Sequence, residues 1–458
     1  MGNEKLAVKY DFVWDVINDA QKAEVMTMGE DYKAFMDASK TERTCTDEIV
    51  RRAEAAGYVD INKVTKLEKG DKVYSTNRGK NVVLAVIGEE PITNGVNIVG
   101  SHIDSPRLDL KQNPLIEKGG MAMFKTHYYG GVRKYQWVAR PLALYGVVIM
   151  ANGEKVEIAI GDDEGDPIFY ISDLLPHLAA DQSKKTLAEG VGGEDLNPIC
   201  GTLPVGDEKD ANRFKMGVLQ LLNEKYGIVE EDFTSAELEL VPAGKARDVG
   251  FDRGSIAAYG HDDRVCAYPA LEAVINCKEP ERTIITVLAD KEEIGSDGNT
   301  GLNSAYMKYF IEDLAEMEGL KGRHVLSMSE CLSADVNACF DPNFPSVHDK
   351  YNCCTLNHGA VITKYTGSRG KSGTSDASAE FVGKVRRILD KANVSWQIGE
   401  LGKVDEGGGG TVAMYIANLD VDTIDVGVPV LSMHAPYEIV SKIDVYMAYK
   451  AFYVFFTK

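Results

Sequence analysis

The sequence predicts an α/β protein in which a mixed sheet is flanked by helices and interrupted by an inserted β-rich domain. After about residue 248, strand-like and helix-like segments alternate, which is typical of a sheet with helices on its faces. Between residues 108 and 247, alternating apolar runs and turn residues indicate antiparallel strands. We therefore expect one domain from residues 1–107 and 248–458, and a second domain formed by the insert.

The N-terminal part of the chain predicts two helices followed by two strands. Apolar residues recur at helical spacing between Trp14 and Met28, and the run TCTDEIVRRAEAAG predicts a second helix that ends at Gly57. The β-branched runs at residues 81–88 and 97–104 predict strands.

The insert contains one clear hairpin signal and one helix. Alternating apolar residues flank Asn152 and Gly153, a pair that favours a type I′ turn between two strands. The run NRFKMGVLQLLNEKYG predicts a helix that ends at Gly227.

The C-terminal part alternates between strands and helices. Apolar periodicity and the positions of Gly, Ser and Asp predict three elements of each kind. Either Ser375 or Asp376 is expected to cap the second of these helices. The predicted strands cover residues 283–290, 324–330 and 423–434, and the predicted helices cover residues 304–318, 375–393 and 441–456.

Charge and cysteine content exclude several classes of protein. The 458 residues carry a net charge of −20, and such a polyanion repels phosphate groups, so neither nucleic acid nor a membrane is an expected partner. The eight cysteines form no CxxC pair, no secretory leader is apparent, and no apolar run approaches ~18 residues. We expect a reduced, cytoplasmic protein.

Side chains that can bind metal follow five strand-like runs. Because open α/β sheets form their sites at the carboxyl ends of strands, we expect these stretches to converge. Imidazole and carboxylate groups without a thiolate suit catalytic zinc, manganese or cobalt better than a closed structural zinc site. Five ligands cover two ions about 3.5–4 Å apart if one carboxylate bridges them, and such a pair acidifies a shared water. The candidate ligands are His102, Asp262, Glu293, Asp335 and His434.

The adjacent acids Glu292 and Glu293 suggest a division of roles. One can bind a metal while the other acts as general base, taking a proton from the water and passing it to a leaving amine. Neighbouring strand residues point in opposite directions, so both acids can serve only where the strand gives way to a loop, which the following IGSDGNTG supplies. Asp104, two residues after His102, is a candidate to hydrogen-bond the imidazole and fix its tautomer.

Each of these signals also has a plainer explanation. A lone histidine near an aspartate is usually structural, adjacent acids usually lie on a solvated surface, and HDDR alone is typical of a helix N-terminus, where acids are favourable. The four glycines at 407–410 form either a loop beside a substrate or an exposed turn. Six histidines lack a strand-end setting and are expected to be structural or exposed: His127, His177, His261, His324, His348 and His358.

Several motifs together resemble the aspartyl aminopeptidase / aminopeptidase I family of di-metal exopeptidases. They are GSHIDSPRLDLKQNPL, YYGGVRKYQWVARPLALYG, DKEEIGS, LSADVNACFDPN, HGAVITK and VLSMHAPYE, in this order through nearly the whole chain. The resemblance implies a zinc-exopeptidase-like fold and a metallo-aminopeptidase for short peptides with a free N-terminus. It implies two divalent ions, usually Zn²⁺, with Co²⁺ or Mn²⁺ as alternatives. It further implies that the insert at 108–247 mediates dimerisation and that dimers assemble into a dodecamer.

The same resemblance assigns roles to individual residues. Glu292 would be the general base, and the peptide bond between Asp262 and Asp263 is expected to be cis. One ion would be held by His102 and Asp335, the other by Glu293 and His434, with Asp262 bridging the two.

The chain departs from the family pattern where substrates are recognised. A Ser and an Arg of the family's MHSxRE motif are replaced by Ala435 and Tyr437, Asp181 stands in place of a histidine, and the usual lysine appears one position late, at Lys364. A neutral or broad preference for the first residue is therefore as well supported as an acidic one. Two other functions stay open: a related di-metal amidohydrolase for N-acylated amino acids, and a non-catalytic shell or peptide-binding protein.

Overall fold

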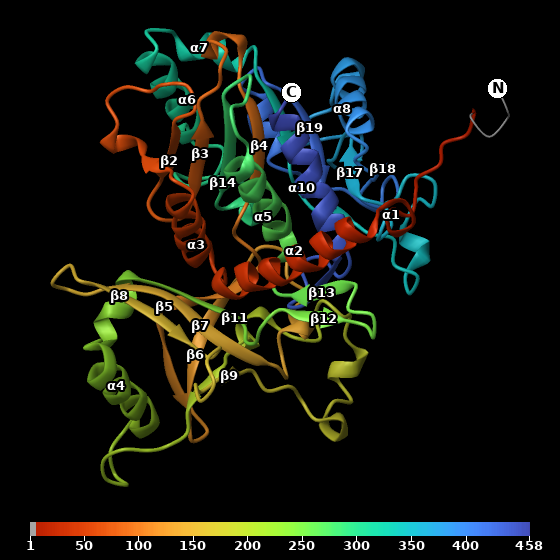
Figure 1. Ribbon diagram of the computed structural model, residues 1–458. Coiled ribbons are helices and arrows are strands. Elements are labelled where there is room, and N and C mark those ends of the chain that lie inside the picture. Colours follow the sequence, from red (N-terminus) through yellow and green to blue (C-terminus); the bar gives the residue numbers. More distant parts are fainter. Residues whose placement is uncertain (1–5) are drawn as a thin grey trace. The chain divides into compact units, whose positions relative to one another are not determined.

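The computed structural model describes residues 6–458 (Figure 1). The chain forms two compact units, each described by itself. The first comprises Met1–Asp104, Ala246–Met433 and Glu438–Lys458, and the second comprises Ser105–Lys245 and His434–Tyr437. The predicted fold class, a mixed sheet flanked by helices with an inserted β-rich part, is confirmed. The role of the insert as a dimerisation domain remains a prediction.

The first unit is built on a nine-stranded mixed sheet with the order β1-β2-β3-β14-β4-β15-β19-β17-β18. The central strands β14, β4, β15 and β19 are parallel to their neighbours in this series. Their carboxyl ends therefore meet at one edge of the sheet, where open α/β sheets form their sites. The strands are β1 (Val59–Asp60), β2 (Lys72–Thr76), β3 (Val82–Val86), β4 (Asn97–His102), β14 (Ile284–Ala289), β15 (Glu330–Ser333), β17 (Ala360–Thr363), β18 (Trp396–Ile398) and β19 (Asp422–Gly427).

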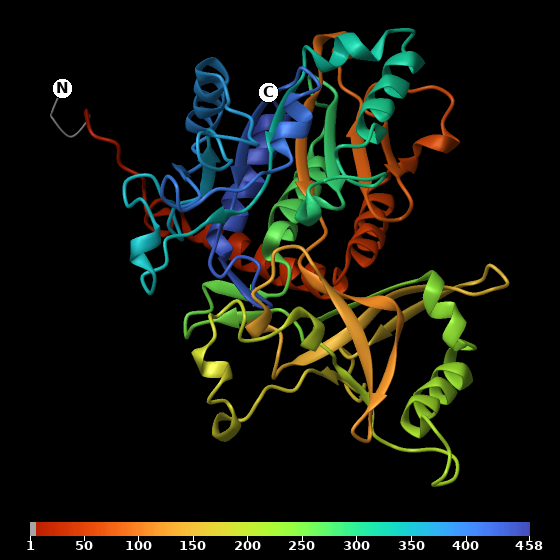
Figure 2. The same ribbon diagram turned by 180° about the vertical axis from the view of Figure 1, so that it is seen from behind.

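Apolar side chains alternate between the two faces of this sheet. In β3, Val82 and Leu84 belong to one core cluster while Val83 and Ala85 belong to another, because successive strand residues point to opposite faces. Helices complete both clusters, so the sheet lies between two helical layers (Figures 1 and 2). The first layer contains α2 (Asp19–Ala38), α3 (Glu42–Ala55), α5 (His261–Asn276), α8 (Ala379–Lys391) and α10 (Lys442–Phe456), and the second contains α6 (Tyr306–Met317), α7 (Gly322–Leu326) and α9 (Ala413–Ala417).

The helices predicted for the N-terminal part are confirmed, with the short helix α1 (Val13–Val16) before them. A capping box starts α2: Gln21 N donates to Asn18 Oδ1 at 2.9 Å, and Asn18 N donates to Gln21 Oε1 at 3.0 Å. Helix α3 ends as expected, because Gly57 follows it with a φ of +89° that favours glycine.

One of the predicted C-terminal strands is wrong in its extent. Residues 324–330 were expected to be a strand, but α7 continues to Leu326 and β15 begins only at Glu330. Periodicity does not separate a short apolar strand from a buried helical turn. In the structure the helix packs closely against α6, where a Cβ on Gly322 would lie 2.3 Å from Cγ of Glu312.

The predicted cap of α8 is also wrong. Ser378 caps this helix, and its Oγ accepts a hydrogen bond from Phe381 N at 3.2 Å. Ser375 and Asp376 lie before the helix start. The other predicted C-terminal elements are found as β14, α6, β19 with β20 (Pro429–Val430), and α10.

The second unit contains a seven-stranded antiparallel sheet with the order β11-β5-β6-β10-β9-β7-β8. Because β11 also pairs with β7, six of these strands form a closed ring and β8 extends it. Helix α4 (Arg213–Tyr226) ends before Gly227, as predicted. The strands are β5 (Arg107–Lys118), β6 (Met121–Tyr129), β7 (Pro141–Ile149), β8 (Lys155–Ile160), β9 (Phe169–Tyr170), β10 (Ile199–Gly201) and β11 (Ala236–Pro242).

The predicted hairpin is present between β7 and β8, but its turn is not type I′. A type I′ turn needs positive φ at both central residues, and of the predicted pair only Gly153, at +87°, has one. Met150 N donates to Glu154 O at 2.8 Å, and Gly153 N donates to Met150 O at 2.8 Å. These two bonds enclose a three-residue loop, in which the glycine alone takes the left-handed conformation.

Two small sheets complete the first unit. One has the order β12-β13-β21, with β12 (Arg247–Val249), β13 (Ser255–Ala258) and β21 (Glu438–Ser441), and the other pairs β16 (Asn337–Ala338) with β20. Among residues 6–458, no helix has both the length and the apolar character needed to cross a membrane.

Candidate metal centre

The site begins at His102, the last residue of the central strand β4. Its side chain is fully buried. Imidazole Nδ1 lies 3.2 Å from Asp104 Oδ1 and 3.1 Å from the Asp104 carbonyl oxygen. These two acceptors favour a proton on Nδ1 and so leave the lone pair on Nε2, the tautomer in which a histidine binds metal through Nε2.

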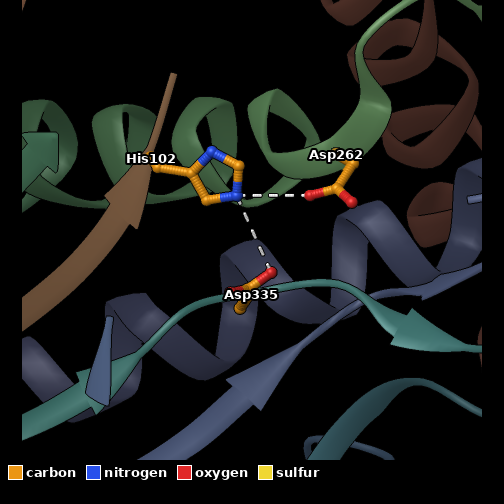
Figure 3. Close-up of side chains that lie close together, drawn as sticks. All are labelled: His102, Asp262 and Asp335. Carbon is orange, nitrogen blue, oxygen red and sulfur yellow. Dashed lines mark ion pairs between the residues drawn. The ribbon is translucent and has the colours of Figure 1, made fainter. Parts of the chain in front are cut away.

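Two carboxylates face Nε2 of His102 (Figure 3). Asp262 Oδ1 lies 3.2 Å away and Asp335 Oδ1 lies 3.9 Å away. One ligand atom from each of the three residues lies within 4.8 Å of the other two, and all three side chains are buried. His102 Nε2 itself is buried and makes no hydrogen bond. The three residues thus meet the geometric requirement for holding one cation between them.

The turn that starts α5 places Asp262. Its backbone N–H donates to Glu438 Oε2 at 3.0 Å, and its φ and ψ are not helical. The peptide bond to Asp263 is cis, as the family resemblance implied. Asp263 then turns towards β4, where its Oδ2 accepts from Ser101 Oγ at 2.5 Å. Asp262 thus faces His102, while the adjacent Asp263 is hydrogen-bonded to β4, the strand that carries His102.

Asp335 can occupy its position because the residue packed against its backbone is a glycine, Gly427. Asp335 follows β15, and its Oδ1 accepts from Val336 N at 2.8 Å. Gly427 ends the neighbouring strand β19, and a Cβ there would lie 1.6 Å from the Asp335 carbonyl oxygen. Glycine is therefore required at this position of the sheet.

Glu292 and Glu293 lie where β14 gives way to a loop, as the sequence predicted. Lys291 has a φ of +67°, and the two acids begin a short 3-10 turn. The Asp104 carboxylate accepts both of their backbone N–H groups, from Glu292 at 3.1 Å and from Glu293 at 3.3 Å. Glu292 Oε2 lies 3.7 Å from His102 Nε2, and a Glu293 oxygen lies within 4.8 Å of an Asp262 oxygen. Asp104 is thus bonded to the imidazole and to the loop of both glutamates.

His434 lies in the four-residue segment that groups with the second unit. It is half-buried, has a φ of +63°, and its Nδ1 lies 2.9 Å from the Gly131 carbonyl oxygen. That acceptor favours the same tautomer as in His102, with the lone pair on Nε2. Six of the seven predicted site residues therefore belong to the first unit, and His434 belongs to the second.

The electrostatics of the cluster call for a cation. Burial raises the pKa of the Asp335 carboxyl well above its usual range, and the neighbouring Asp263 raises it further. Burial alone would lower the pKa of the His102 imidazole, but the carboxylates of Asp104 and Asp262 raise it well above its ordinary value. A positive charge among these buried acids would therefore stabilise their ionised forms. A divalent ion would supply that charge, and the donor set fits catalytic zinc.

Sequence reasoning missed three supporting residues. Asp263 and Glu438 hold the backbone around His102 and Asp262. Tyr32 in α2 donates its hydroxyl to His261 Nδ1 at 2.6 Å, while His261 Nε2 lies 3.1 Å from the Ile256 carbonyl oxygen. His261 was expected to be structural, and it is. An acid next to a candidate ligand was the one available signal for Asp263, whereas nothing local marked Tyr32.

Comparison with known proteins identifies the family. The model of the family described as Aminopeptidase I zinc metalloprotease (M18) matches residues 35–456. The chain belongs to the M18 family. This places it among metallo-aminopeptidases, which are hydrolases, as the sequence motifs implied.

Full-length relatives agree with this assignment. The chain is 49% identical over 449 residues to the "Probable M18 family aminopeptidase 1" of Clostridium acetobutylicum, covering 96% of this chain and 97% of the relative. The crystal structure of an M18 aminopeptidase from Thermotoga maritima superimposes with a TM-score of 0.95 at 43% identity, covering 99% of this M18 chain and all of that one. The S. cerevisiae mApe1 dodecamer, with a TM-score of 0.76 at 21% identity over 94% of this chain and 96% of that one, shares the fold.

Proposed function

We propose that this M18 aminopeptidase removes the N-terminal residue from short peptides with the help of two divalent ions, Zn²⁺ in preference to Co²⁺ or Mn²⁺. The observation that carries this proposal is the buried Nε2 of His102, which makes no hydrogen bond and faces the carboxylates of Asp262 and Asp335. A lone pair so placed fits a metal ligand better than a structural histidine.

The ligands divide into two sets. His102 and Asp335 would hold the first ion, Glu293 and His434 the second, and Asp262 would bridge the two. This division is supported by the donor types, by the grouping of Asp262 with His102 and Asp335 on the one hand and with Glu293 on the other, and by the matching Nε2 tautomers that the Nδ1 partners of both histidines favour. When bound, such ions acidify a water and polarise the scissile carbonyl.

Glu292 is the proposed general base. Its carboxylate lies 3.7 Å from His102 Nε2 and so borders the metal cluster, while its backbone is fixed by Asp104. It would take a proton from the attacking water and deliver it to the leaving amine. Asp104 orients His102 and the loop of both glutamates, so it acts on the reaction by holding other groups in place.

We propose further that the insert mediates dimerisation, that dimers assemble into a dodecamer, and that the protein works in the cytoplasm. Dimerisation through the insert is supported by the family resemblance, and the dodecamer is supported by that resemblance and by the dodecamer named for the mApe1 structure. The third is supported by eight cysteines that are all free thiols.

One experiment tests the activity. Purified protein is analysed for bound metal and assayed on a panel of aminoacyl anilides, each compared with its N-acetyl form, with and without a chelator. We expect close to two ions per chain, turnover of the free amines alone, loss of turnover with the chelator and recovery with Zn²⁺. Preferential cleavage of the N-acetyl forms would indicate an amidohydrolase, and inactivity of the fully metallated protein would indicate a non-catalytic role.

A further inference from the structure

Arg140 is an arginine of the second unit with no ionic partner. Among residues 6–458, no carboxylate lies within ion-pairing distance of its guanidinium, and its Nε is buried without a hydrogen bond. Burial lowers its pKa, and the nearby Tyr437 only partly offsets this effect. An uncompensated, partly desolvated cation is costly to a fold, so a group retained in this state calls for an explanation.

A second arginine of the same unit shows what compensation looks like. The guanidinium of Arg107 lies 3.8 Å from the centre of the Tyr129 ring, 2.8 Å from Asp109 Oδ1 and 3.2 Å from Glu239 Oε1. Arg140 has the aromatic half of this arrangement, with its guanidinium 5.8 Å from the centre of the Tyr437 ring. The carboxylate half is absent.

Arg140 also lies against the segment that carries the proposed ligand His434. Tyr437 is three residues after His434, and its hydroxyl donates to the Lys245 carbonyl oxygen at 2.9 Å, which fixes the ring. Earlier in the same stretch of chain, Gly131 lies against His434: a Cβ on Gly131 would lie 2.9 Å from His434 Nδ1. The stretch from Gly131 to Arg140 therefore contacts both ends of the segment His434–Tyr437.

We propose that Arg140 binds a carboxylate of the peptide substrate, with Tyr437 supporting the guanidinium from one side. A guanidinium offers two parallel N–H donors that bind a carboxylate through bidentate hydrogen bonds. The proposal rests on the proposed aminopeptidase function and names a substrate feature for it. The carboxylate can belong to an acidic first residue or to the C-terminus of a short peptide, and the two sources share one recognition chemistry.

The test uses two pairs of substrates that differ only in one carboxylate. The first pair is the aspartyl and asparaginyl p-nitroanilides, and the second is Leu-Ala and Leu-Ala amide. For Arg140→Met, we expect kcat/KM on the carboxylate member of one pair to fall about 10- to 100-fold, mostly through KM, while its neutral counterpart changes by less than about threefold. The pair that responds identifies the source of the carboxylate.

Two further variants sharpen the result. Arg133→Met removes the same charge from an exposed arginine of the same stretch, whose guanidinium lies 5.1 Å from the Tyr135 ring, and should leave both ratios at wild-type values. Arg140→Lys keeps the positive charge but not the two parallel donors. It should therefore lose only part of the preference for the carboxylate member of the pair. It also supplies the measurement if Arg140→Met proves too unstable to assay.

The outcomes separate this inference from the proposed function. If the wild-type protein cleaves the substrates but Arg140→Met changes both members of each pair equally, or changes only the oligomeric state, Arg140 does not bind a substrate carboxylate. An equal effect of Arg133→Met would likewise overturn the inference, because it would reveal a general charge effect. If the metallated wild-type protein cleaves none of the four compounds, the proposed function itself fails.

Discussion

Asp104→Asn is expected to weaken metal binding although it conserves the shape of the side chain. In the wild-type protein, Asp104 Oδ1 lies 3.2 Å from His102 Nδ1 and accepts Glu292 N, while Oδ2 accepts Glu293 N. An asparagine keeps one acceptor oxygen and presents an NH₂ group in place of the other. Whichever way the amide turns, at least one N–H donor then faces another donor.

The size of the effect follows from this lost acceptor. Removing an outer partner of a metal-binding histidine typically costs about 10- to 100-fold in metal affinity, which corresponds to about 1.4–2.7 kcal/mol. Competition for Zn²⁺ against a chromophoric chelator measures the affinity directly, without relying on turnover. Asp422→Asn, at an exposed aspartate on β19, changes the net charge by the same amount and serves as control. An Asp104→Asn affinity within about twofold of both the wild type and this control would refute the reasoning.

Three further changes have defined outcomes. Glu292→Gln should retain its metal, measured by elemental analysis, but lose about 10²- to 10⁴-fold in kcat as expected for a general base; near-normal turnover would remove Glu292 from that role. Gly427→Ala should displace Asp335, because the new Cβ would meet its carbonyl oxygen at 1.6 Å, so the purified variant should carry less metal and unfold at a lower temperature. Burial lowers the pKa of His261 to about 3, so this group stabilises the fold fully above its unfolded pKa of ~6.5, and that stabilisation is lost as pH falls towards 3, by up to ~1.4 kcal/mol per pH unit. Urea unfolding at pH 7 and pH 5 should show a larger loss for the wild type than for His261→Gln, and equal losses would contradict the assignment.

The core strands could be read from the sequence because they are buried on both faces. The runs that became β3, β4 and β14 are continuous and β-branched, which is the pattern of central strands between two helical layers. The run at 324–330 carried a weaker signal, since Val325 and Leu326 suit a buried helical turn as well as a strand. The helix that forms there packs Gly322 against α6, and no local pattern reveals such a contact.

The candidate site was predictable to the extent that strand ends mark it. His102, Asp262 and Asp335 were each selected as strand-end residues, and the parallel alignment of β4 and β15 explains why two of them meet. The residues that support them were not predictable in this way. Glu438 lies 176 residues from the backbone N–H that it accepts, and Tyr32 lies 229 residues from His261. Such contacts depend on how the layers pack, which sequence spacing does not encode.

The chain leaves the first unit at two points, and both lie beside proposed ligands. The first is after Asp104, two residues beyond His102, and the second is at His434 itself. Insertions and deletions in the second unit can therefore accumulate without breaking any hydrogen bond of the nine-stranded sheet. Related chains can in this way vary the length of the second unit while they keep the strand order of the first.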